Sequence, residues 1–264
     1  MIFGFIGSGN MGGAIIGGII NSDIASPENV IVSDKNEQAL KNINEKYGVK
    51  VTSDNKETAD KADVLFLCVK PQFLYGVIDE IKNSVSDNTV IVSIVAGQAI
   101  ETIEKAFEHN IKLVRVMPNT PALVGEGMAA LTPNSNVTKE ETDVVVNVFN
   151  SLGKGEVVSE NLMDAVTAVS GSSPAYVFMM IEAMADAAVI GGMPRSQAYT
   201  FAAQAVLGSA KMVLETGKHP GELKDMVCSP AGTTIEAVRT LEELGFRSSI
   251  IEAMKVCEEM SRSL

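Results

Sequence analysis

The chain has 264 residues and a formal net charge of −12, and 46% of its residues are hydrophobic while 20% are charged. This balance is typical of a soluble globular protein with one large domain or two ordinary ones. Because nonspecific binding to nucleic acids or to anionic membranes requires a basic face, the acidic charge argues against both.

No side chain from Met1 to Ser22 carries a charge, a length that would suit a transmembrane helix. Seven of the first 18 residues are glycine, however, and each glycine costs a helix interior about 1 kcal/mol relative to alanine. A signal peptide needs a basic region before its apolar core, and the first basic residue is Lys35. We therefore expect a cytoplasmic protein with no membrane segment.

The same N-terminal segment predicts a phosphate-binding turn. A short apolar strand, Ile2–Ile6, leads into a GxGxxG motif and a helix-compatible stretch, Met11–Ile20. The first glycine makes the tight turn, the second lets the backbone approach a pyrophosphate, and the third allows close packing of helix on strand. Free N–H groups at the helix start then face the phosphates. The residues of this turn are Gly7, Ser8, Gly9, Asn10, Met11 and Gly12.

Strand-like and helix-like runs then alternate in the manner of βαβ units. We expect strands at Ile2–Ile6, Val30–Ser33, Val49–Val51, Val64–Val69, Thr89–Ile94, Lys112–Val116 and near Met128–Leu131. We expect helices at Met11–Ile20, Glu37–Lys46, Gln72–Asn83, Ile100–Glu108 and Glu140–Leu152. This pattern predicts a doubly wound, parallel α/β sheet of the Rossmann type over residues 1–161, with its ligand crevice at the carboxyl ends of the strands.

Beyond Val158 the strand signals disappear, and long helical stretches rich in Ala and Met follow. Ser173 is expected to be an N-cap, Pro174 the first residue of its helix, and Gly191 the end of that helix. Further helices are expected at Pro194–Thr216, Thr234–Leu244 and Ser248–Met260. Residues 162–264 are therefore predicted to form an all-helical domain.

The first helix of this domain is apolar on several faces, so we expect a partner chain to cover part of it. Burial inside a single subunit is the alternative. The residues that leave little polar surface are Met179, Met180, Ile181, Met184, Ala185, Ala188 and Val189.

Cysteine and histidine usage is sparse. Cys68, Cys228 and Cys257 form no CxxC pair, which favours reduced intracellular thiols over a disulfide framework. With only two histidines, the sequence shows no cluster with metal-ligand spacing, and we expect no metal.

Asp34 follows the second strand, 22 residues after Gly12. An acid at this position accepts hydrogen bonds from a ribose 2′-hydroxyl, which favours NADH, whereas a 2′-phosphate would meet like charge. Ser33 and Lys35 are the alternative ligands for such a phosphate. The sequence therefore leaves NADH and NADPH both open.

Five motifs, in this order along the whole chain, resemble pyrroline-5-carboxylate reductase. The resemblance implies a homodimer, open to further assembly, that reduces 1-pyrroline-5-carboxylate to L-proline with NADPH or NADH in the last step of proline biosynthesis. The motifs are Phe5-Ile6-Gly7-Ser8-Gly9-Asn10-Met11-Gly12, Val69-Lys70-Pro71, Arg115-Val116-Met117-Pro118-Asn119-Thr120-Pro121, Ser170-Gly171-Ser172-Ser173-Pro174-Ala175-Tyr176 and Ser229-Pro230-Ala231-Gly232-Thr233-Thr234.

The resemblance also implies site residues. Those assigned to the cofactor cleft, besides the glycine turn and residues 33–35, are Asn55, Val69, Lys70, Pro71, Val95, Ala96, Gly97 and, toward the nicotinamide, Pro118 and Asn119. The alternative for the residues at 69–71 is a plain strand stop, and for those at 118–119 a rigid turn between two prolines.

A second predicted site precedes a helix of the C-terminal part. Backbone N–H groups there, with the Thr234 hydroxyl, suit a substrate carboxylate, and Thr234 is placed to hydrogen-bond the ring nitrogen as the catalytic residue. Its alternative is ordinary helix capping by threonine. The residues of this predicted cradle are Ser229, Gly232, Thr233 and Thr234.

The absence of basic residues from one segment of the sequence constrains the mechanism. No Lys, Arg or His lies between Gly155 and Pro194, where a hydroxyacid dehydrogenase of similar plan would carry its acid/base lysine. A protonated imine is already an electrophile, so its reduction needs orientation and carboxylate binding more than a general base. The alternatives are a β-hydroxyacid or arogenate-type dehydrogenase, which this absence disfavours, and a sensor that binds the nicotinamide cofactor without turnover.

Overall fold

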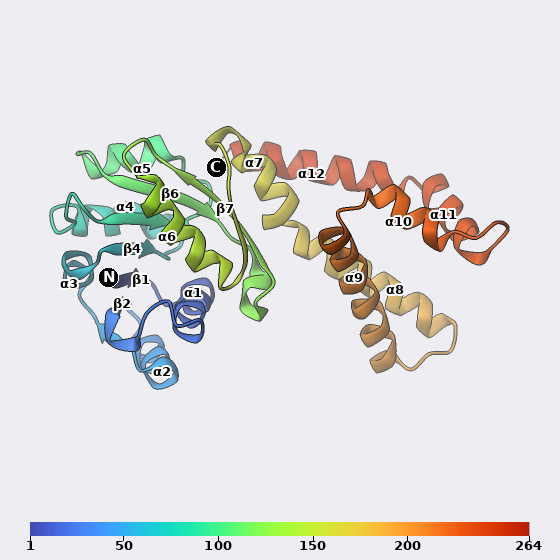
Figure 1. Ribbon diagram of the computed structural model, residues 1–264, viewed down its shortest axis with the longest axis horizontal. Coiled ribbons are helices and arrows are strands. Elements are labelled where there is room, and N and C mark those ends of the chain that lie inside the picture. Colours follow the sequence, from blue (N-terminus) through green and yellow to red (C-terminus); the bar gives the residue numbers. More distant parts are fainter. Residues whose placement is uncertain (264) are drawn as a thin grey trace. The chain divides into compact units, whose positions relative to one another are not determined.

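The computed structural model describes residues 1–263. Its single sheet has eight strands in the order β3-β2-β1-β4-β5-β6-β7-β8 (Figure 1). The strands are β1 (Phe3–Ile6), β2 (Val30–Ser33), β3 (Lys50–Thr52), β4 (Val64–Leu67), β5 (Val90–Ser93), β6 (Lys112–Met117), β7 (Gly127–Pro133) and β8 (Gly153–Val157). The order places β1 beside β4, and the direction in which strands are added reverses between these two, as a doubly wound fold requires.

The expectation of a wholly parallel sheet is wrong at one position. All neighbouring strands pair in parallel except β6 and β7, which are antiparallel, with Val116 opposite Leu131. Antiparallel neighbours need only a short connection, whereas a parallel pair needs a crossover long enough for a helix. The link from Met117 to Gly127 contains only a 3₁₀ segment, η2 (Thr120–Val124), and is too short for such a crossover.

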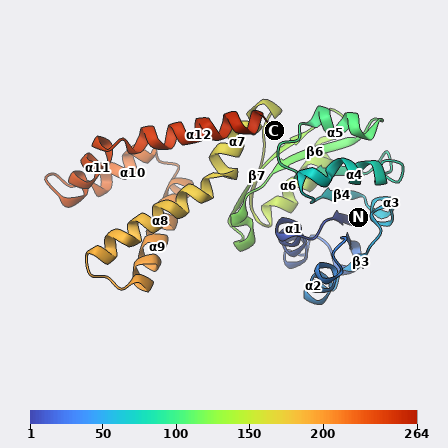
Figure 2. The ribbon, with the colours of Figure 1, turned by 180° about the vertical axis from the view of Figure 1, so that it is seen from behind.

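Helices cover both faces of the sheet, and two separate apolar cores result. The core on one face takes side chains from α1 (Asn10–Asn21), α2 (Glu37–Tyr47) and α6 (Lys139–Asn150). The core on the other face takes them from α3 (Asn55–Lys61), α4 (Pro71–Ile81) and α5 (Ile100–Phe107), which follow one another along the sheet in both views (Figures 1 and 2).

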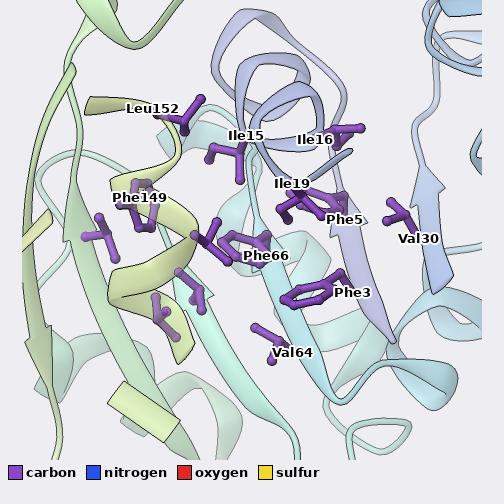
Figure 3. Packing of buried hydrophobic residues seen from close by; sticks show 14 of the residues in the cluster. Phe3, Phe5, Ile15, Ile16, Ile19, Val30, Val64, Phe66, Phe149 and Leu152 are labelled. Carbon is purple, nitrogen blue, oxygen red and sulfur yellow. The ribbon is translucent and has the colours of Figure 1, made fainter. Parts of the chain in front are cut away.

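The first core is centred on aromatic side chains of adjacent strands (Figure 3). Phe5 of β1 lies opposite Phe66 of β4, and their rings stack with centroids 4.6 Å apart. Phe149 of α6 tilts against Phe66 at 6.4 Å. Ile15, Ile16 and Ile19 of α1 pack in the same core, which holds β1 and α1 together and so determines where the glycine turn between them lies.

Two compact units divide the chain, one of Met1–Gly171 with Glu258–Leu264 and one of Ser172–Cys257. The first unit also contains the segments η1 (Pro27–Asn29), η3 (Glu160–Leu162), α7 (Met163–Val166) and a π-helical turn, η4 (Thr167–Gly171). The C-terminal segment of this unit, which starts at Glu258, is held by a hydrogen bond in which the Ser261 hydroxyl donates to Asp164 Oδ1 at 2.8 Å. The predicted domain boundary between residues 161 and 162 stays a prediction.

The second unit is helical. Its helices are α8 (Ser173–Ile190), α9 (Arg195–Thr216), α10 (Pro220–Val227), α11 (Thr233–Glu243) and α12 (Phe246–Arg262), the last of which runs on into the first unit. Ser172, not Ser173 as expected, is the N-cap of α8, and Pro174 is therefore its second residue. The difference is one residue because Pro is tolerated at either of the first helical positions, whose N–H groups lack intrahelical acceptors.

The helical stretch Glu160–Ile190 is long and apolar enough to cross a membrane by length and composition alone. One such helix is weak evidence for a membrane span. Only 6% of the most apolar 18-residue part of this stretch is buried within the chain. An apolar surface this exposed is expected to lie against another apolar surface.

Candidate functional site

The three glycines of the N-terminal turn have different reasons to be glycine. Gly7 has φ +100°, and a Cβ there would lie 2.5 Å from the Cys68 carbonyl oxygen. A Cβ on Gly12 would lie 2.5 Å from the Gly7 oxygen. A Cβ on Gly9 would meet no atom within 4 Å. The fold therefore needs Gly7 and Gly12, while the space at Gly9 is open to a ligand.

Helix α1 begins at this turn with unpartnered donors. Gly9 is its N-cap and supplies no side-chain cap. Among the described residues, the N–H groups of Asn10 and Met11 have no recorded hydrogen-bond acceptor. Such groups, with the positive end of the helix dipole, bind anions, as the sequence predicts for this position.

Asp34 is tied to the glycine turn. Its Oδ2 accepts hydrogen bonds from the Ser8 N–H and the Ser8 hydroxyl, both at 2.8 Å, and its Oδ1 accepts one from the Asn36 N–H at 2.9 Å. Each carboxylate oxygen has two lone pairs. Oδ2 is thus fully used within the chain, and only Oδ1 has room for one further donor such as a ribose hydroxyl.

A cavity of about 490 Å³ opens beside the turn. It brings together eight of the residues predicted for the cofactor: Gly7, Gly9, Ser33, Asp34, Lys35, Asn55, Val69 and Lys70. Ser8 and Asn10 line a hollow of about 710 Å³ instead. Neither hollow is lined by Met11, Gly12, Pro71, Val95, Ala96, Gly97, Pro118 or Asn119.

Ser33 does not have a free hydroxyl. The residue is fully buried, and its Oγ donates to Asn55 Oδ1 at 2.8 Å. Asn55 is 4% exposed, and its Nδ2 donates to Glu80 Oε2 at 2.9 Å. Of the two residues suggested as phosphate ligands, only the exposed Lys35 therefore has its polar group available.

The segment 69–71 begins a helix, and the strand before it, β4, already ends at Leu67 rather than at Val69 as expected. Lys70 is the N-cap of α4, and Pro71 is the first residue of that helix. Proline suits this position because its missing N–H would have had no intrahelical acceptor. Cys68 lies just before it in the same cavity wall, and burial raises the pKa of its thiol well above the ordinary value.

Sequence reasoning missed the part of the cavity wall that α4 supplies. Phe73, which is 58% exposed, lines the cavity, as do Gln72, Gly76 and Val77. The signal available in the sequence was an aromatic residue in the first turn of a helix whose aliphatic residues, Leu74, Val77, Ile78 and Ile81, face the core. Glu80, further along the same helix, does not line the cavity but accepts a hydrogen bond from Asn55 Nδ2.

The two predicted loops beyond the cavity have structural roles in the described chain. Val95 is 3% exposed, and Gly97 takes a left-handed conformation with φ +72°. Asn119 donates from Nδ2 to the Ser170 oxygen at 3.0 Å and accepts from the Met128 N–H at 2.9 Å. These bonds use its side-chain amide to join β7 and the π-helical turn, so cofactor contacts by this residue rest on its backbone or on its remaining amide hydrogen.

In the helical unit, the turn before α11 brings the predicted cradle residues together. The Gly232 N–H donates to the Ser229 oxygen at 3.0 Å, and a Cβ on Gly232 would lie 2.3 Å from Ser229 Oγ. Gly232 is the N-cap of α11, and no side chain caps the helix. The alternative that Thr234 is a helix cap is therefore wrong, since Thr234 is the second residue of α11.

Donors are left free at this helix start. Among residues 1–263, no acceptor is recorded for the N–H groups of Thr233 and Thr234, nor a partner for the Thr234 hydroxyl. The expected helix Thr234–Leu244 differs from α11 by one residue at each end, which moves both threonines into its first turn. Their N–H groups point along the helix axis, as carboxylate binding requires.

A hydroxyl and thiol cluster lies at the start of α8. Cys257 donates from Sγ to Ser172 Oγ at 3.3 Å. The pKa of the Tyr176 phenol is raised, first by its hydrogen bond with Cys257 and then by burial. All three residues belong to the second unit, and two of them come from the Ser170–Tyr176 motif. The cluster accounts for part of that motif through packing of α8 on α12.

Comparison with known proteins identifies both halves of the chain. A family described as pyrroline-5-carboxylate reductase dimerisation matches residues 160–264, and one described as NADP oxidoreductase coenzyme F420-dependent matches residues 2–97. Pyrroline-5-carboxylate reductase of Escherichia coli strain K12 is 54% identical over 261 residues, which cover 99% of this chain and 97% of the relative.

Solved structures agree. A pyrroline-5-carboxylate reductase from Coxiella burnetii superimposes with a TM-score of 0.94 and 34% identity, covering 99% of this chain and 97% of the other. The Plasmodium falciparum enzyme, solved with NADP bound, gives 0.88 and 33%, covering 100% and 97%. The chain therefore belongs to the pyrroline-5-carboxylate reductase family, oxidoreductases that reduce 1-pyrroline-5-carboxylate to L-proline with a nicotinamide cofactor.

Proposed function

We propose that the two sites described above are the cofactor site and the substrate site of a pyrroline-5-carboxylate reductase. The observation that carries this proposal is the cavity beside the glycine turn, which gathers eight predicted cofactor residues from four different strand ends and helix starts. Its assignment to a nicotinamide dinucleotide is also supported by the full-length likeness to the Escherichia coli enzyme.

The residues present fit such a cofactor. The N–H groups at the start of α1 suit its pyrophosphate, and the open space at Gly9 lets the phosphates come close to the backbone. Phe73 offers an apolar wall for the adenine, and Asp34 Oδ1 or Lys35 suits the ribose or its phosphate. When bound, the reduced nicotinamide supplies a hydride to C5 of the pyrroline ring.

The helical unit orients the substrate. We assign its carboxylate to the free N–H groups of Thr233 and Thr234, because anions are stabilised at a helix N-terminus. The Thr234 hydroxyl, which has no partner among the described residues, hydrogen-bonds the ring nitrogen. No side chain needs to transfer a proton in the hydride step, since the protonated imine becomes a neutral amine.

Cofactor preference depends on the end of β2. Asp34 adds negative charge where a 2′-phosphate would lie, and Lys35 adds positive charge beside it. Because two of the four lone pairs of Asp34 are used by Ser8 and one by Asn36, it can accept a single ribose hydroxyl. We propose that the enzyme accepts both NADH and NADPH and discriminates weakly between them.

We further propose a cytoplasmic homodimer built through the helical unit. The match to the dimerisation family covers residues 160–264 and includes the apolar stretch Glu160–Ile190. Large apolar side chains exposed on this unit include Phe178, Met179, Ile190, Phe201 and Leu214. A second copy covers such a surface as well as lipid would, and the chain then needs no membrane.

One assay tests the function. Purified protein should oxidise reduced nicotinamide only when 1-pyrroline-5-carboxylate is added, and it should not reduce oxidised cofactor with 3-hydroxyisobutyrate or arogenate. Light scattering of the same preparation, made without detergent, should give at least twice the mass of the chain. Cofactor binding without turnover would support a sensor instead, and a detergent-dependent preparation would overturn the soluble dimer.

A further inference from the structure

A buried hydrogen-bond chain leads from the cofactor cavity to a carboxylate that lies outside it. Ser33 at the end of β2 donates to Asn55 at the start of α3, and Asn55 donates to Glu80 near the end of α4. Ser33 and Asn55 line the cavity, but Glu80 does not. None of the motifs that identify the family contains Glu80.

The chemistry of the three groups fixes the direction of this chain. A carboxylate only accepts hydrogen bonds, so Glu80 must face the amide nitrogen of Asn55. The amide oxygen then faces Ser33, whose hydroxyl donates to it at 2.8 Å. Glu80 therefore selects one of the two flipped orientations of the Asn55 amide.

This orientation decides which donor and acceptor atoms of the Asn55 amide remain free for a ligand in the cavity. One Nδ2 hydrogen is used by Glu80, and the other remains, together with a second lone pair on Oδ1. Without Glu80, the amide would keep only its bond to Ser33, and at 4% exposure it would have no water to replace the lost partner. Either flip would then be open to it.

Among residues 1–263, the Glu80 carboxylate forms no ion pair. Within the described chain, no Lys, Arg or His nitrogen lies within 4.0 Å of its carboxylate, whereas the neighbouring Asp79 pairs with Lys82 at 3.0 Å. Its recorded partner is the Asn55 amide. A charge kept in a part-buried hydrogen bond to a single amide is better explained by orientation of that amide than by surface electrostatics.

We propose that Glu80 is a positioning residue for the adenosine half of the cofactor, and that it acts by fixing the Asn55 amide. The inference rests on the proposed cofactor site. Asp34 and Lys35, which line the same cavity, place the adenosine ribose at this end, because they follow the second strand of the dinucleotide fold. Glu80 itself contacts neither cofactor nor substrate.

The test uses the full-length enzyme with Glu80→Leu, Glu80→Gln and, as a control for charge on the same helix, Asp79→Asn. Dissociation constants are measured for NADPH, for the fragment 2′,5′-ADP and for reduced nicotinamide mononucleotide. Glu80→Leu should weaken NADPH and 2′,5′-ADP about 5- to 30-fold, the effect expected when a misoriented Asn55 amide loses one hydrogen bond to the bound nucleotide. The mononucleotide should bind within about twofold of the wild type, because it lacks the adenosine half.

Steady-state kinetics should likewise show an effect on cofactor binding and none on turnover or on imine binding. Glu80→Leu should raise the KM for the dinucleotide and leave kcat at saturating cofactor and the KM for the imine within about twofold. Glu80→Gln, which can still accept through its amide oxygen, should fall between wild type and Glu80→Leu. Asp79→Asn should match the wild type, since it changes charge without touching Asn55.

A double-mutant cycle decides whether Asn55 carries the effect. In an Asn55→Ala background, Glu80→Leu should cause no further loss of 2′,5′-ADP affinity. Equal losses in both backgrounds would overturn the proposal, as would unchanged fragment binding in Glu80→Leu. Failure of the wild type to bind either NADPH or NADH would instead overturn the proposed cofactor site. If Glu80→Leu is unfolded by thermal melting, Glu80→Gln and the cycle built on it supply the same comparison.

Discussion

The Asp34 carboxylate accepts two hydrogen bonds from Ser8, one from the backbone N–H and one from the hydroxyl, each at 2.8 Å. The residue that should recognise the cofactor ribose thus also holds the glycine turn that should receive the phosphates. The two halves of the cofactor site are coupled through one side chain, and substitutions there should change both stability and specificity.

Asp34→Ser tests this coupling. Loss of the charged acceptor should lower the free energy of unfolding by about 1 to 3 kcal/mol, because Ser8 and Asn36 lose their partner. Removal of the negative charge should also favour NADPH over NADH relative to wild type. Chemical denaturation and kcat/KM for both cofactors measure the two effects. The control Ser8→Ala should cost about 0.5 to 1.5 kcal/mol and change the cofactor ratio much less. A strongly NADPH-selective wild type would contradict the role given to Asp34.

Gly7→Ala should lower stability, whereas Gly9→Ala should lower the affinity for the dinucleotide. At Gly7, with φ +100° and the Cys68 oxygen 2.5 Å from a new Cβ, alanine should lower Tm and the yield of folded protein. At Gly9 the new methyl group meets nothing in the chain, so Tm without cofactor should stay within a few degrees. Dinucleotide affinity should nevertheless drop at least tenfold, because the methyl group occupies the phosphate approach. Normal affinity in Gly9→Ala would remove the turn from the cofactor site.

Thr234→Val keeps the side-chain volume and removes the hydroxyl. Because Gly232 rather than Thr234 caps α11, the free energy of unfolding should hardly change. We expect kcat/KM for the imine to fall about 5- to 150-fold, which corresponds to roughly 1 to 3 kcal/mol, while the free N–H groups still bind the carboxylate. Cofactor affinity should be the same as in wild type. Unchanged kcat/KM would show that the hydroxyl does not contact the substrate.

Because the Cys68 thiol is buried, we expect the free energy of unfolding to fall at alkaline pH. Burial raises the pKa of its thiol above the ordinary 9.0, so the folded state favours the protonated form. Its contribution is fully present below pH 9 and is lost as the pH rises further, since the unfolded chain then releases a proton that the folded chain retains. Between pH 8 and pH 10, wild type should lose about 1 kcal/mol more than Cys68→Ala in urea denaturation. Parallel pH profiles for the two proteins would contradict this account.

The central strands of the sheet could be predicted because each is a short, continuous apolar run in a layer buried on both faces. β8 could not, since its sequence, Gly153–Val157, carries charge and glycine and becomes a strand through pairing with β7. α3 was also missed, because its seven residues show no apolar stripe. Its N-cap, Asp54, which accepts from the Lys56 N–H, was the one local signal.

The candidate site also has a part that could be predicted from the sequence and a part that could not. The glycine turn and Asp34 follow from motif spacing, because the chemistry of a dinucleotide demands those residue types close together in sequence. The bonds of Asp34 to Ser8, and of Glu80 to Asn55, join residues 26 and 25 positions apart and exist only once the sheet is assembled. Those helices that were predicted start within two residues of the expected position, yet that margin decided whether Thr234 capped its helix.

The bond from Ser261 to Asp164 has a consequence for biosynthesis. The unit that begins at Met1 includes a segment that the ribosome makes only after the helices of the other unit, Ser172–Cys257, have emerged. A nascent chain halted before residue 258 would leave Asp164 without Ser261 and without Arg262, whose Nε lies 3.8 Å from it. Folding of the N-terminal sheet can start early during translation, but the contact between Asp164 and the C-terminal segment of this unit can form only near the end of synthesis.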